Sequence, residues 1–175
     1  MSQKDRIFEF SELDFDSPIA DQDEIRRHNP QRYEVEQLTG IVFESDARQC
    51  CVGYKDVTDH EFWVRGHMPG LPIMPGVIIL EAAAQLCSYY VHKFQLMGPS
   101  VILGLGGLEE VRFRDPVRPG DRLIVGAELL KMRVGAMCVC RFQAYVGESL
   151  VAEGKIKGVA LPIGLLSAAA SGTVA

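Results

Sequence analysis

The pattern of apolar and polar positions predicts one long buried helix set among strands. From Val77 to Val91 nearly every residue is apolar or small, and Glu81 carries the only formal charge. A helix that is apolar on every side is expected to be surrounded by protein. This stretch is too short and too interrupted to cross a bilayer. Glycine and proline residues flank it, so the helix is expected to begin near Gly76 and to end near Met97.

The segments on either side of this helix predict strands. Before it, an irregular strand is expected near residues 33–43 and a second over 49–57. After it, alternating segments joined by glycine-containing turns predict antiparallel strands over residues 101–105, 108–114, 122–132, 136–146 and 150–161. A curved antiparallel sheet wrapped around the single helix is the simplest way to bury that helix, which makes the fold class α+β. One face of the helix is left for a second copy of the chain.

The 175 residues fit one domain with an arm. Residues 1–20 are acidic with a few aromatics, which predicts a flexible or loosely docked arm. Residues 21–162 form the expected domain, which opens with a short helix from Asp21 to His28. Residues 163–175 are small and low in complexity, so a disordered tail is expected there.

The charge of the chain is uneven. A net charge of -5 argues against nucleic acid as the main partner. Residues 1–110 carry 9 basic and 18 acidic side chains, whereas residues 111–175 carry 9 basic and 5 acidic ones. The basic C-terminal part suits an acidic partner or a phosphate, and a scatter of solvated strand residues explains it equally well.

The five cysteines show neither a C-x-x-C motif nor the spacing of a disulfide framework. They are expected to be reduced thiols that pack as small apolar side chains, and no metal site is predicted. The N-terminus lacks a positively charged region followed by an apolar run, so no signal peptide is expected. These features predict a cytoplasmic protein without membrane insertion.

His67 is the first candidate for chemistry. It lies between Gly66 and the run M-P-G-L-P-I-M-P-G, whose prolines and glycines exclude a helix and fix tight turns. Such a loop would hold the imidazole in one orientation, and a neutral imidazole is the usual general base near neutral pH. A histidine without function in a loop is the alternative.

Glu81 is the second candidate, because it is isolated in the apolar helix with no basic neighbour within one turn. Burial favours the protonated form of a carboxyl group, which suits a proton donor. Gln85 lies one turn further on the same face, where it would hydrogen-bond and orient the carboxylate. A capping or ion-pairing role for Glu81 and a satisfied buried amide for Gln85 are the structural alternatives.

The backbone N–H groups of Gly76 and Val77 are the third element. They fall in the first turn of the helix, where they lack intrahelical partners and carry the positive end of the helix dipole. A developing oxyanion would bind there. A base, an acid and oxyanion donors together suit proton abstraction next to a carbonyl and loss of water from a 3-hydroxyacyl thioester. This chemistry needs no cofactor and no metal, and the chain has no glycine-rich nucleotide fingerprint.

The segment GHMPGLPIMPGVIILEAAAQ (residues 66–85) closely resembles the signature of the bacterial 3-hydroxyacyl-[acyl-carrier-protein] dehydratases of type II fatty acid synthesis, a family with the hot-dog fold. The run VRFRDPVRPGD (residues 111–121) is similar to a second segment of that family. The resemblance covers about Tyr33 to Leu161. It implies a curved antiparallel sheet around one central helix.

The resemblance also implies roles for single residues. It makes His67 and Glu81 catalytic and places the oxyanion amides at Gly76 and Val77. The carboxylate is glutamate, as in the general dehydratases, whereas the dehydratase/isomerase branch has aspartate. The implied reaction converts (3R)-3-hydroxyacyl thioesters on acyl-carrier protein to trans-2-enoyl thioesters. The implied assembly is a homodimer in which His67 of one protomer meets Glu81 of the other, with a trimer of dimers (a hexamer) as a further possibility.

Two stretches depart from this family. Glu34-Val35-Glu36-Gln37 stands where the family has an apolar Pro-Phe-Leu-Leu segment, and Met68 stands where it has phenylalanine. These differences leave room for a relative that acts in specialised lipid or polyketide synthesis. The alternative functions are a hot-dog acyl thioesterase and a non-catalytic acyl-carrier or lipid-binding protein. The intact pattern H-x-P-G, M-P-G-x and Glu81 argues against the thioesterase, and retention of both His67 and Glu81 argues against the non-catalytic protein.

Overall fold

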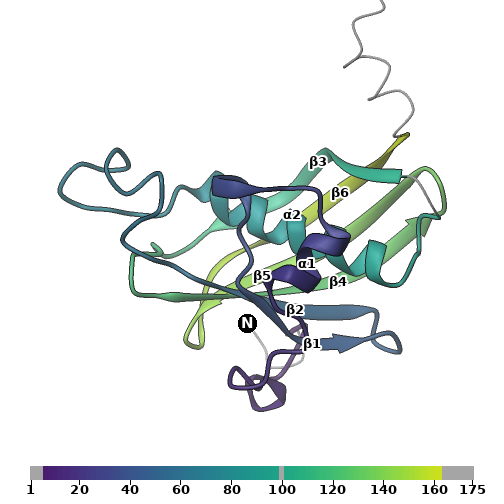
Figure 1. Cartoon of the computed structure of the whole chain (residues 1–175), viewed down its shortest axis with the longest axis horizontal. Coiled ribbons are helices and arrows are strands. Elements are labelled where there is room, and N and C mark those ends of the chain that lie inside the picture. The colour runs from purple at the N-terminus through teal and green to yellow at the C-terminus, as the bar shows by residue number, and fades with distance from the viewer. Residues whose placement is uncertain (1–5, 99–100, 163–175) are drawn as a thin grey trace, which may run out of the picture.

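A six-stranded antiparallel sheet wraps around one long helix, as Figure 1 shows. The computed structural model describes residues 6–98 and 101–162, so the predicted tail (163–175) and the first five residues of the arm lie outside it. The α-helices, 3₁₀ helices (η) and strands are η2 (Phe10–Glu12), α1 (Gln22–His28), η3 (Tyr33–Val35), β1 (Gly40–Ser45), β2 (Cys50–Asp56), α2 (Gly76–Lys93), β3 (Val101–Phe113), β4 (Arg122–Arg133), β5 (Met137–Val146) and β6 (Ser149–Pro162). The α+β architecture predicted from the sequence is confirmed.

The strands follow the order β1-β2-β4-β5-β6-β3, and every neighbouring pair is antiparallel. The two strands predicted between residues 101 and 114 are a single strand, β3, at one edge of the sheet. Its pairing with β6 shifts register between Leu105 and Gly107 and again between Glu109 and Arg112. Such irregularities bend a strand without ending it, which explains why the sequence pattern appeared broken there.

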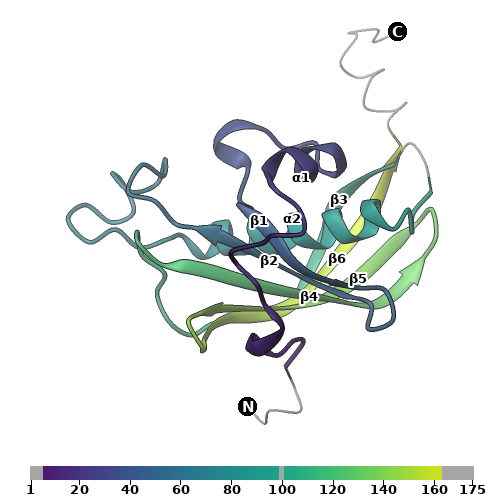
Figure 2. The same cartoon turned by 60° about the horizontal axis from the view of Figure 1, so that its bottom comes forward.

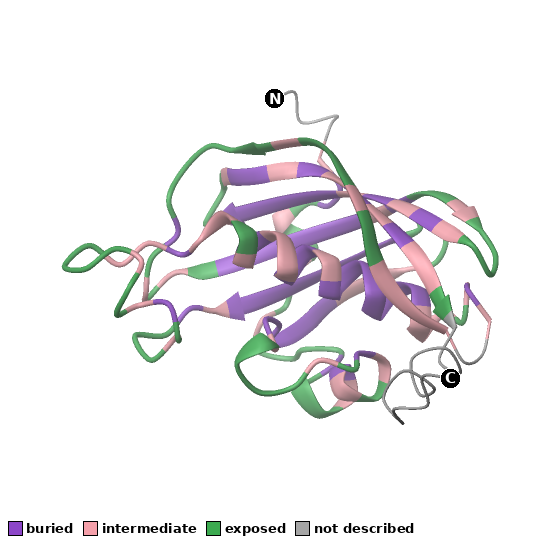
Figure 3. Cartoon of the chain, turned by 90° about the horizontal axis from the view of Figure 1, so that it is seen from above, coloured by how far each residue is buried: buried purple, intermediate pink, exposed green. Residues whose placement is uncertain are grey.

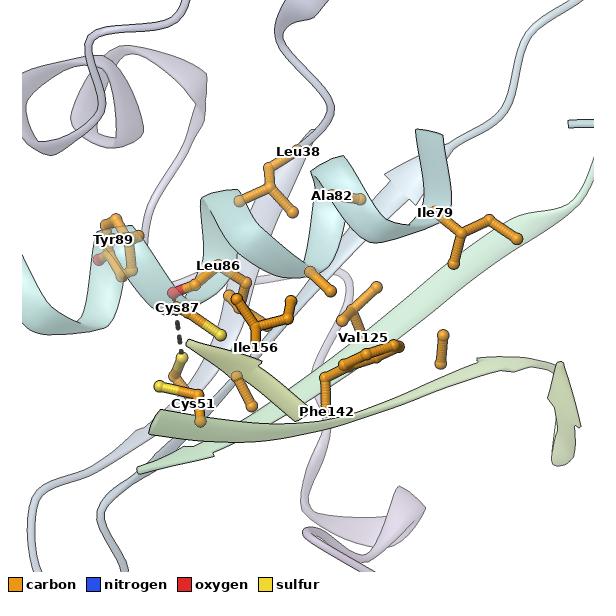
Figure 4. Packing of buried hydrophobic residues seen from close by; sticks show 14 of the residues in the cluster. Leu38, Cys51, Ile79, Ala82, Leu86, Cys87, Tyr89, Val125, Phe142 and Ile156 are labelled. Carbon is orange, nitrogen blue, oxygen red and sulfur yellow. Dashed lines mark hydrogen bonds between the residues drawn. The ribbon is translucent and has the colours of Figure 1, made fainter. Parts of the chain in front are cut away.

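The core lies between α2 and the sheet. Ala82 and Leu86 on the helix pack with Val125, Phe142 and Ile156 on the strands, as Figure 4 shows. The first four of these side chains are inaccessible to solvent. Each large apolar side chain buried in this way contributes roughly 1.5–3 kcal/mol. Apolar packing therefore fixes the position of α2 on the sheet.

Helix α2 differs from its prediction in two respects. It ends at Lys93 instead of near Met97, because Gln95 adopts a left-handed conformation (φ 53°). A left-handed residue just beyond a helix ends the helical hydrogen bonding. The helix is also not surrounded on every side, since the side chain of Val77 is 68% exposed in the single chain. The helix is therefore enclosed on every side only over its second half, where each residue from Gln85 to Val91 is buried, and its first turn is open.

The described part of the N-terminal segment, residues 6–20, is docked on the sheet, which is the second of the two alternatives expected for the arm. Phe8 is only 2% exposed and packs over Gly126 of β4, where an added Cβ would lie 2.7 Å from its ring. The backbone N–H of Ile7 donates to Oε1 of Gln143 over 3.0 Å. Figure 2 shows this segment under the sheet, on the side away from α2, before it passes the β1 edge to reach α1. Phe8 thus fills a socket over Gly126, which composition alone does not reveal.

The edge formed by β3 is the least covered part of the sheet, as the exposure colours of Figure 3 show. Leu105, Leu108 and Phe113 on this strand are exposed apolar side chains.

In the part of the chain that the structure describes, no helix has the length and apolar content needed to span a membrane.

Candidate active site

His67 lies in the loop between β2 and α2, and its backbone is fixed on both sides. Its N–H donates to the carbonyl oxygen of the buried Trp63 over 2.8 Å, and its carbonyl oxygen accepts from the N–H of Ile73 over 2.9 Å. A 2.8 Å hydrogen bond from the N–H of Met74 to the carbonyl of Val117, which lies between β3 and β4, fixes the end of the loop. These contacts hold the backbone of His67 in one place.

The imidazole ring of His67 is half-buried and has one nitrogen engaged. Its Nδ1 lies 2.7 Å from the carbonyl oxygen of Ile73. Because a carbonyl oxygen only accepts, Nδ1 must carry the hydrogen of the neutral ring. This tautomer leaves the lone pair on Nε2, which is the atom able to take a proton from a substrate.

An ion pair ties the start of the loop to β2. Nζ of Lys55 lies 2.9 Å from Oε1 of Glu61, and both side chains are largely buried. The N–H of Thr58 also donates to this carboxylate, over 3.4 Å. Breaking a buried pair of this kind is strongly destabilising because one charge is left without a partner. The loop therefore leaves β2 from a fixed point.

Glu81 lies on the second turn of α2, partly exposed, and Gln85 engages one of its oxygens. Nε2 of Gln85 donates to Oε1 of Glu81 over 2.7 Å and to the carbonyl of Val35 over 2.6 Å. Oε1 of Gln85 accepts from the N–H of Gln37 over 2.9 Å. The reverse orientation of the amide would set donor against donor and acceptor against acceptor. The predicted hydrogen bond between Gln85 and Glu81 is present, and Oε2 of Glu81 is the oxygen left for a proton.

The sequence pattern missed the segment that holds Gln85. The irregular strand predicted from Tyr33 is instead η3, and β1 begins only at Gly40. Tyr33 has a φ of 61°, which turns the chain so that residues 35–37 meet α2. Gln37 is 1% exposed despite its polar side chain. The one available signal was the polar stretch at residues 34–37, where the resembled family is apolar.

The first turn of α2 presents free donors. The carbonyl oxygen of Pro75 accepts from the N–H groups of Ile78 and Ile79, over 2.9 and 3.3 Å. Within residues 6–98 and 101–162, the N–H groups of Gly76 and Val77 make no backbone hydrogen bond. The positive end of the helix dipole lies at the same place. These amides can bind a developing negative charge.

Phe113 of β3 is a site residue that the sequence did not single out. A Cβ added to Gly76 would lie 2.8 Å from the far end of its ring, so a larger residue at this position would require the ring to shift. The ring and the first turn of α2 border a hollow of about 400 Å³. Its lining residues are Met74, Gly76, Val77, Ile79, Phe113, Asp115, Pro116 and Val117. The only sequence signal for Phe113 was its place in the run at residues 111–121.

The structure thus brings Glu81 and Gln85 together, while His67 belongs to a separate loop. No hydrogen bond joins His67 to Glu81 in the described part of a single chain. Over the same residues, no group of three or more histidine, cysteine, aspartate or glutamate side chains is arranged to hold a metal ion.

Similarity to known proteins agrees with the fold. Residues 29–155 match the model of the FabA-like domain family. The 3-hydroxyacyl-[acyl-carrier-protein] dehydratase FabZ of Alkalilimnicola ehrlichii is 37% identical over 141 residues, which cover 79% of this chain and 90% of that protein. In the dehydratase heterocomplex ApeI:P from Xenorhabdus doucetiae, a chain superimposes with a TM-score of 0.67 at 15% identity and covers 81% of this chain and 96% of its own length.

The fluoroacetyl-CoA thioesterase FlK is also similar in structure, with a TM-score of 0.61 at 13% identity, covering 76% of this chain and all of that chain. Likeness at this level of identity shows a shared fold and does not separate dehydratases from thioesterases. The chain belongs to the FabA-like domain family. Within it the chain is a FabZ-like hot-dog protein, which confirms the resemblance and the hot-dog fold predicted from the sequence.

Proposed function

We propose that this protein is a 3-hydroxyacyl-[acyl-carrier-protein] dehydratase of fatty acid or related lipid synthesis. The observation that carries the proposal is that each acid–base side chain has one atom held by the protein and one left for substrate. Nδ1 of His67 is engaged by the carbonyl of Ile73, which leaves Nε2. Oε1 of Glu81 is engaged by Gln85, which leaves Oε2. The named activity of FabZ relatives at 37% identity supports the same reaction.

The proposed reaction moves two protons in opposite directions. Nε2 of His67 takes the proton from C2 of the 3-hydroxyacyl thioester, and the electron pair of that bond forms the C2–C3 double bond. The C3–O bond breaks, and the leaving hydroxyl takes the proton from Oε2 of Glu81 to depart as water. The products are the trans-2-enoyl thioester, an imidazolium at His67 and a carboxylate at Glu81. Transfer of one proton from His67 back to Glu81 restores the starting state.

The first turn of α2 acts on the thioester carbonyl. As C2 loses its proton, negative charge develops on the carbonyl oxygen. The N–H groups of Gly76 and Val77 bind this oxygen, aided by the helix dipole. Donors fixed in advance in this way are worth most where water is excluded, and the ring of Phe113 covers one side of Gly76.

The active site is completed by a second copy of the chain in this proposal. Val77 and the edge strand β3 expose apolar side chains that a monomer would leave in water, namely Val77, Leu105, Leu108 and Phe113. Within the described residues of one chain His67 and Glu81 share no hydrogen bond, and in this proposal His67 of one protomer acts with Glu81 of its partner. A homodimer is therefore expected, and a trimer of dimers remains a prediction.

The substrate carrier in this proposal is an acidic acyl-carrier protein. Arg112, Arg114 and Arg118 are exposed in the basic C-terminal part of the chain and would face such a partner. We place the protein in the cytoplasm, where its cysteines would stay reduced. All five are free and buried.

Hydration of a crotonyl thioester, the reverse reaction, tests the proposal through loss of the enoyl absorbance. The thioester is presented on acyl-carrier protein and on coenzyme A. We expect turnover by the wild type, and a loss of roughly 10²–10⁴-fold in kcat for His67→Ala and for Glu81→Gln, the range for general acid–base groups. Size-exclusion chromatography and thermal melting verify that both variants keep the assembly and the fold.

Other outcomes assign other functions. Release of free thiol from saturated acyl thioesters without enoyl hydration would identify a thioesterase. Binding of acyl-carrier protein without either turnover would identify a non-catalytic relative. Full activity of both variants would remove His67 and Glu81 from the mechanism.

A further inference from the structure

The ion pair between Arg26 of α1 and Glu36 is the origin of this inference. Nε of Arg26 lies 2.7 Å from Oε1 of Glu36, and Nη2 lies 2.9 Å from Oε2. Two parallel bonds of this kind fix orientation as well as distance. The Glu36 side chain is only 11% exposed, and Arg26 holds its pKa below the usual range. The pair is therefore far better defined than a surface salt bridge.

Glu36 sits between the two residues that hold the amide of Gln85. Val35 supplies the carbonyl that accepts from Gln85 Nε2, and Gln37 supplies the N–H that donates to Gln85 Oε1. Any movement of this segment would move the amide, and Oε1 of Glu81 is bonded to that amide. Arg26 thus acts on Glu81 through three successive contacts.

Helix α1 is itself fixed on α2, so Arg26 holds residues 35–37 from a fixed position. Nδ2 of Asn29, at the end of α1, donates to the carbonyl oxygen of Gln85 over 2.9 Å. Nζ of Lys93 lies 2.9 Å from Oε1 of Glu24, which joins the end of α2 to α1. The arrangement is a closed frame of α1, residues 35–37 and α2 around Glu81.

We infer that Arg26 and Glu36 are positioning residues for Glu81 and hold its free oxygen toward the substrate through Gln85. The inference rests on the proposed dehydratase function. It also gives a role to the polar stretch at residues 34–37, where the resembled family has apolar residues.

The test compares enoyl-thioester hydration by Glu36→Ala, Arg26→Met and the double variant with wild type. We expect kcat to fall about tenfold in each single variant while KM changes less than about twofold, because the orientation of the acid is lost but substrate contacts are kept. The double variant should lose no more than either single one, because both changes break the same relay. Arg27→Met is the matched control, since Arg27 pairs with Glu24 on the same helix and does not touch residues 35–37.

A second readout does not depend on turnover. Exchange of the Gln85 side-chain amide protons, followed by NMR, should be slow in wild type and in Arg27→Met and faster in Glu36→Ala. Thermal melting verifies that each variant is folded at the assay temperature, and Glu36→Gln replaces Glu36→Ala if that variant is not.

The outcomes separate this inference from the proposed function. An active wild type whose kcat is unchanged in Glu36→Ala and Arg26→Met would overturn the relay alone. A rise in KM with unchanged kcat would also overturn it, since the segment would then contact substrate directly. A wild type without enoyl hydration would overturn the dehydratase function and the relay together.

Discussion

The side-chain amide of Gln85 bonds to Oε1 of Glu81 over 2.7 Å and is itself fixed by the backbone of the segment before β1. Glu81 therefore has one oxygen occupied by the protein and one available. In the same way, the carbonyl of Ile73 engages Nδ1 of His67 and leaves Nε2 available. Such fixed partners decide which atom gives a proton and which atom takes one.

Replacing Gln85 by leucine tests the first of these contacts. We expect the variant to lose about 1–3 kcal/mol of stability, since the N–H of Gln37 and the carbonyl of Val35 would lose a buried partner. We expect kcat to fall about tenfold because Glu81 is no longer oriented. Steady-state kinetics and denaturant titration measure the two effects. Ser88→Ala, one turn further along α2, is the control, and equal losses in both variants would contradict a specific role for Gln85.

Gly76→Ala tests the contact with Phe113. The new Cβ would meet the ring at 2.8 Å, so we expect a loss of about 1 kcal/mol, the low end of the range for overpacking, because the half-exposed ring can shift. Thermal melting measures this loss, and adding Phe113→Leu should recover part of it. Gly107→Ala is the control, because an added Cβ there meets nothing closer than 3.9 Å. An unchanged melting temperature in Gly76→Ala would show that the ring moves aside freely.

Phe8→Ala tests the docking of the N-terminal segment. Removing this buried ring should destabilise the protein by about 3–5 kcal/mol, the usual range for Phe→Ala in a core. Because the segment lies on the face of the sheet away from α2, kcat per folded molecule should not change. Chemical denaturation and the enoyl-hydration assay measure the two quantities. Phe10→Ala, at a less buried ring, should cost less, and an equal cost would argue against a specific socket at Gly126.

The cysteines provide a test of the core. All five are buried and free, and burial raises the pKa values of Cys50 and Cys51. Since the thiolate is the reactive form, the native protein should react with a thiol reagent far more slowly than the unfolded chain. Titration with Ellman's reagent, with and without guanidinium chloride, measures both rates. Rapid reaction of the native protein would show that the core opens readily.

The sequence by itself determined the fold class and the candidate chemistry. The helix, its apolar character and the loop before it are local features, because His67, Gly76, Val77, Glu81 and Gln85 all fall within residues 66–85. Spacing along one helix also predicted the bond between Gln85 and Glu81, since residues four apart share a face. The alternation of apolar and polar residues after the helix predicted the strands, because successive side chains of a strand point to opposite faces.

Only the tertiary structure decided how distant segments meet. The socket at Gly126 for Phe8, the approach of Phe113 to Gly76 and the clamp of residues 35–37 on Gln85 each join segments at least 37 positions apart. Local periodicity carries no information about such pairs. They depend on strand order, on bulges and on which cavity a side chain fills once the sheet has curved around α2. The exposure of β3 likewise depends on its place at the edge of the sheet. The lack of a hydrogen bond between His67 and Glu81 in the described residues depends on the path of the loop that carries His67.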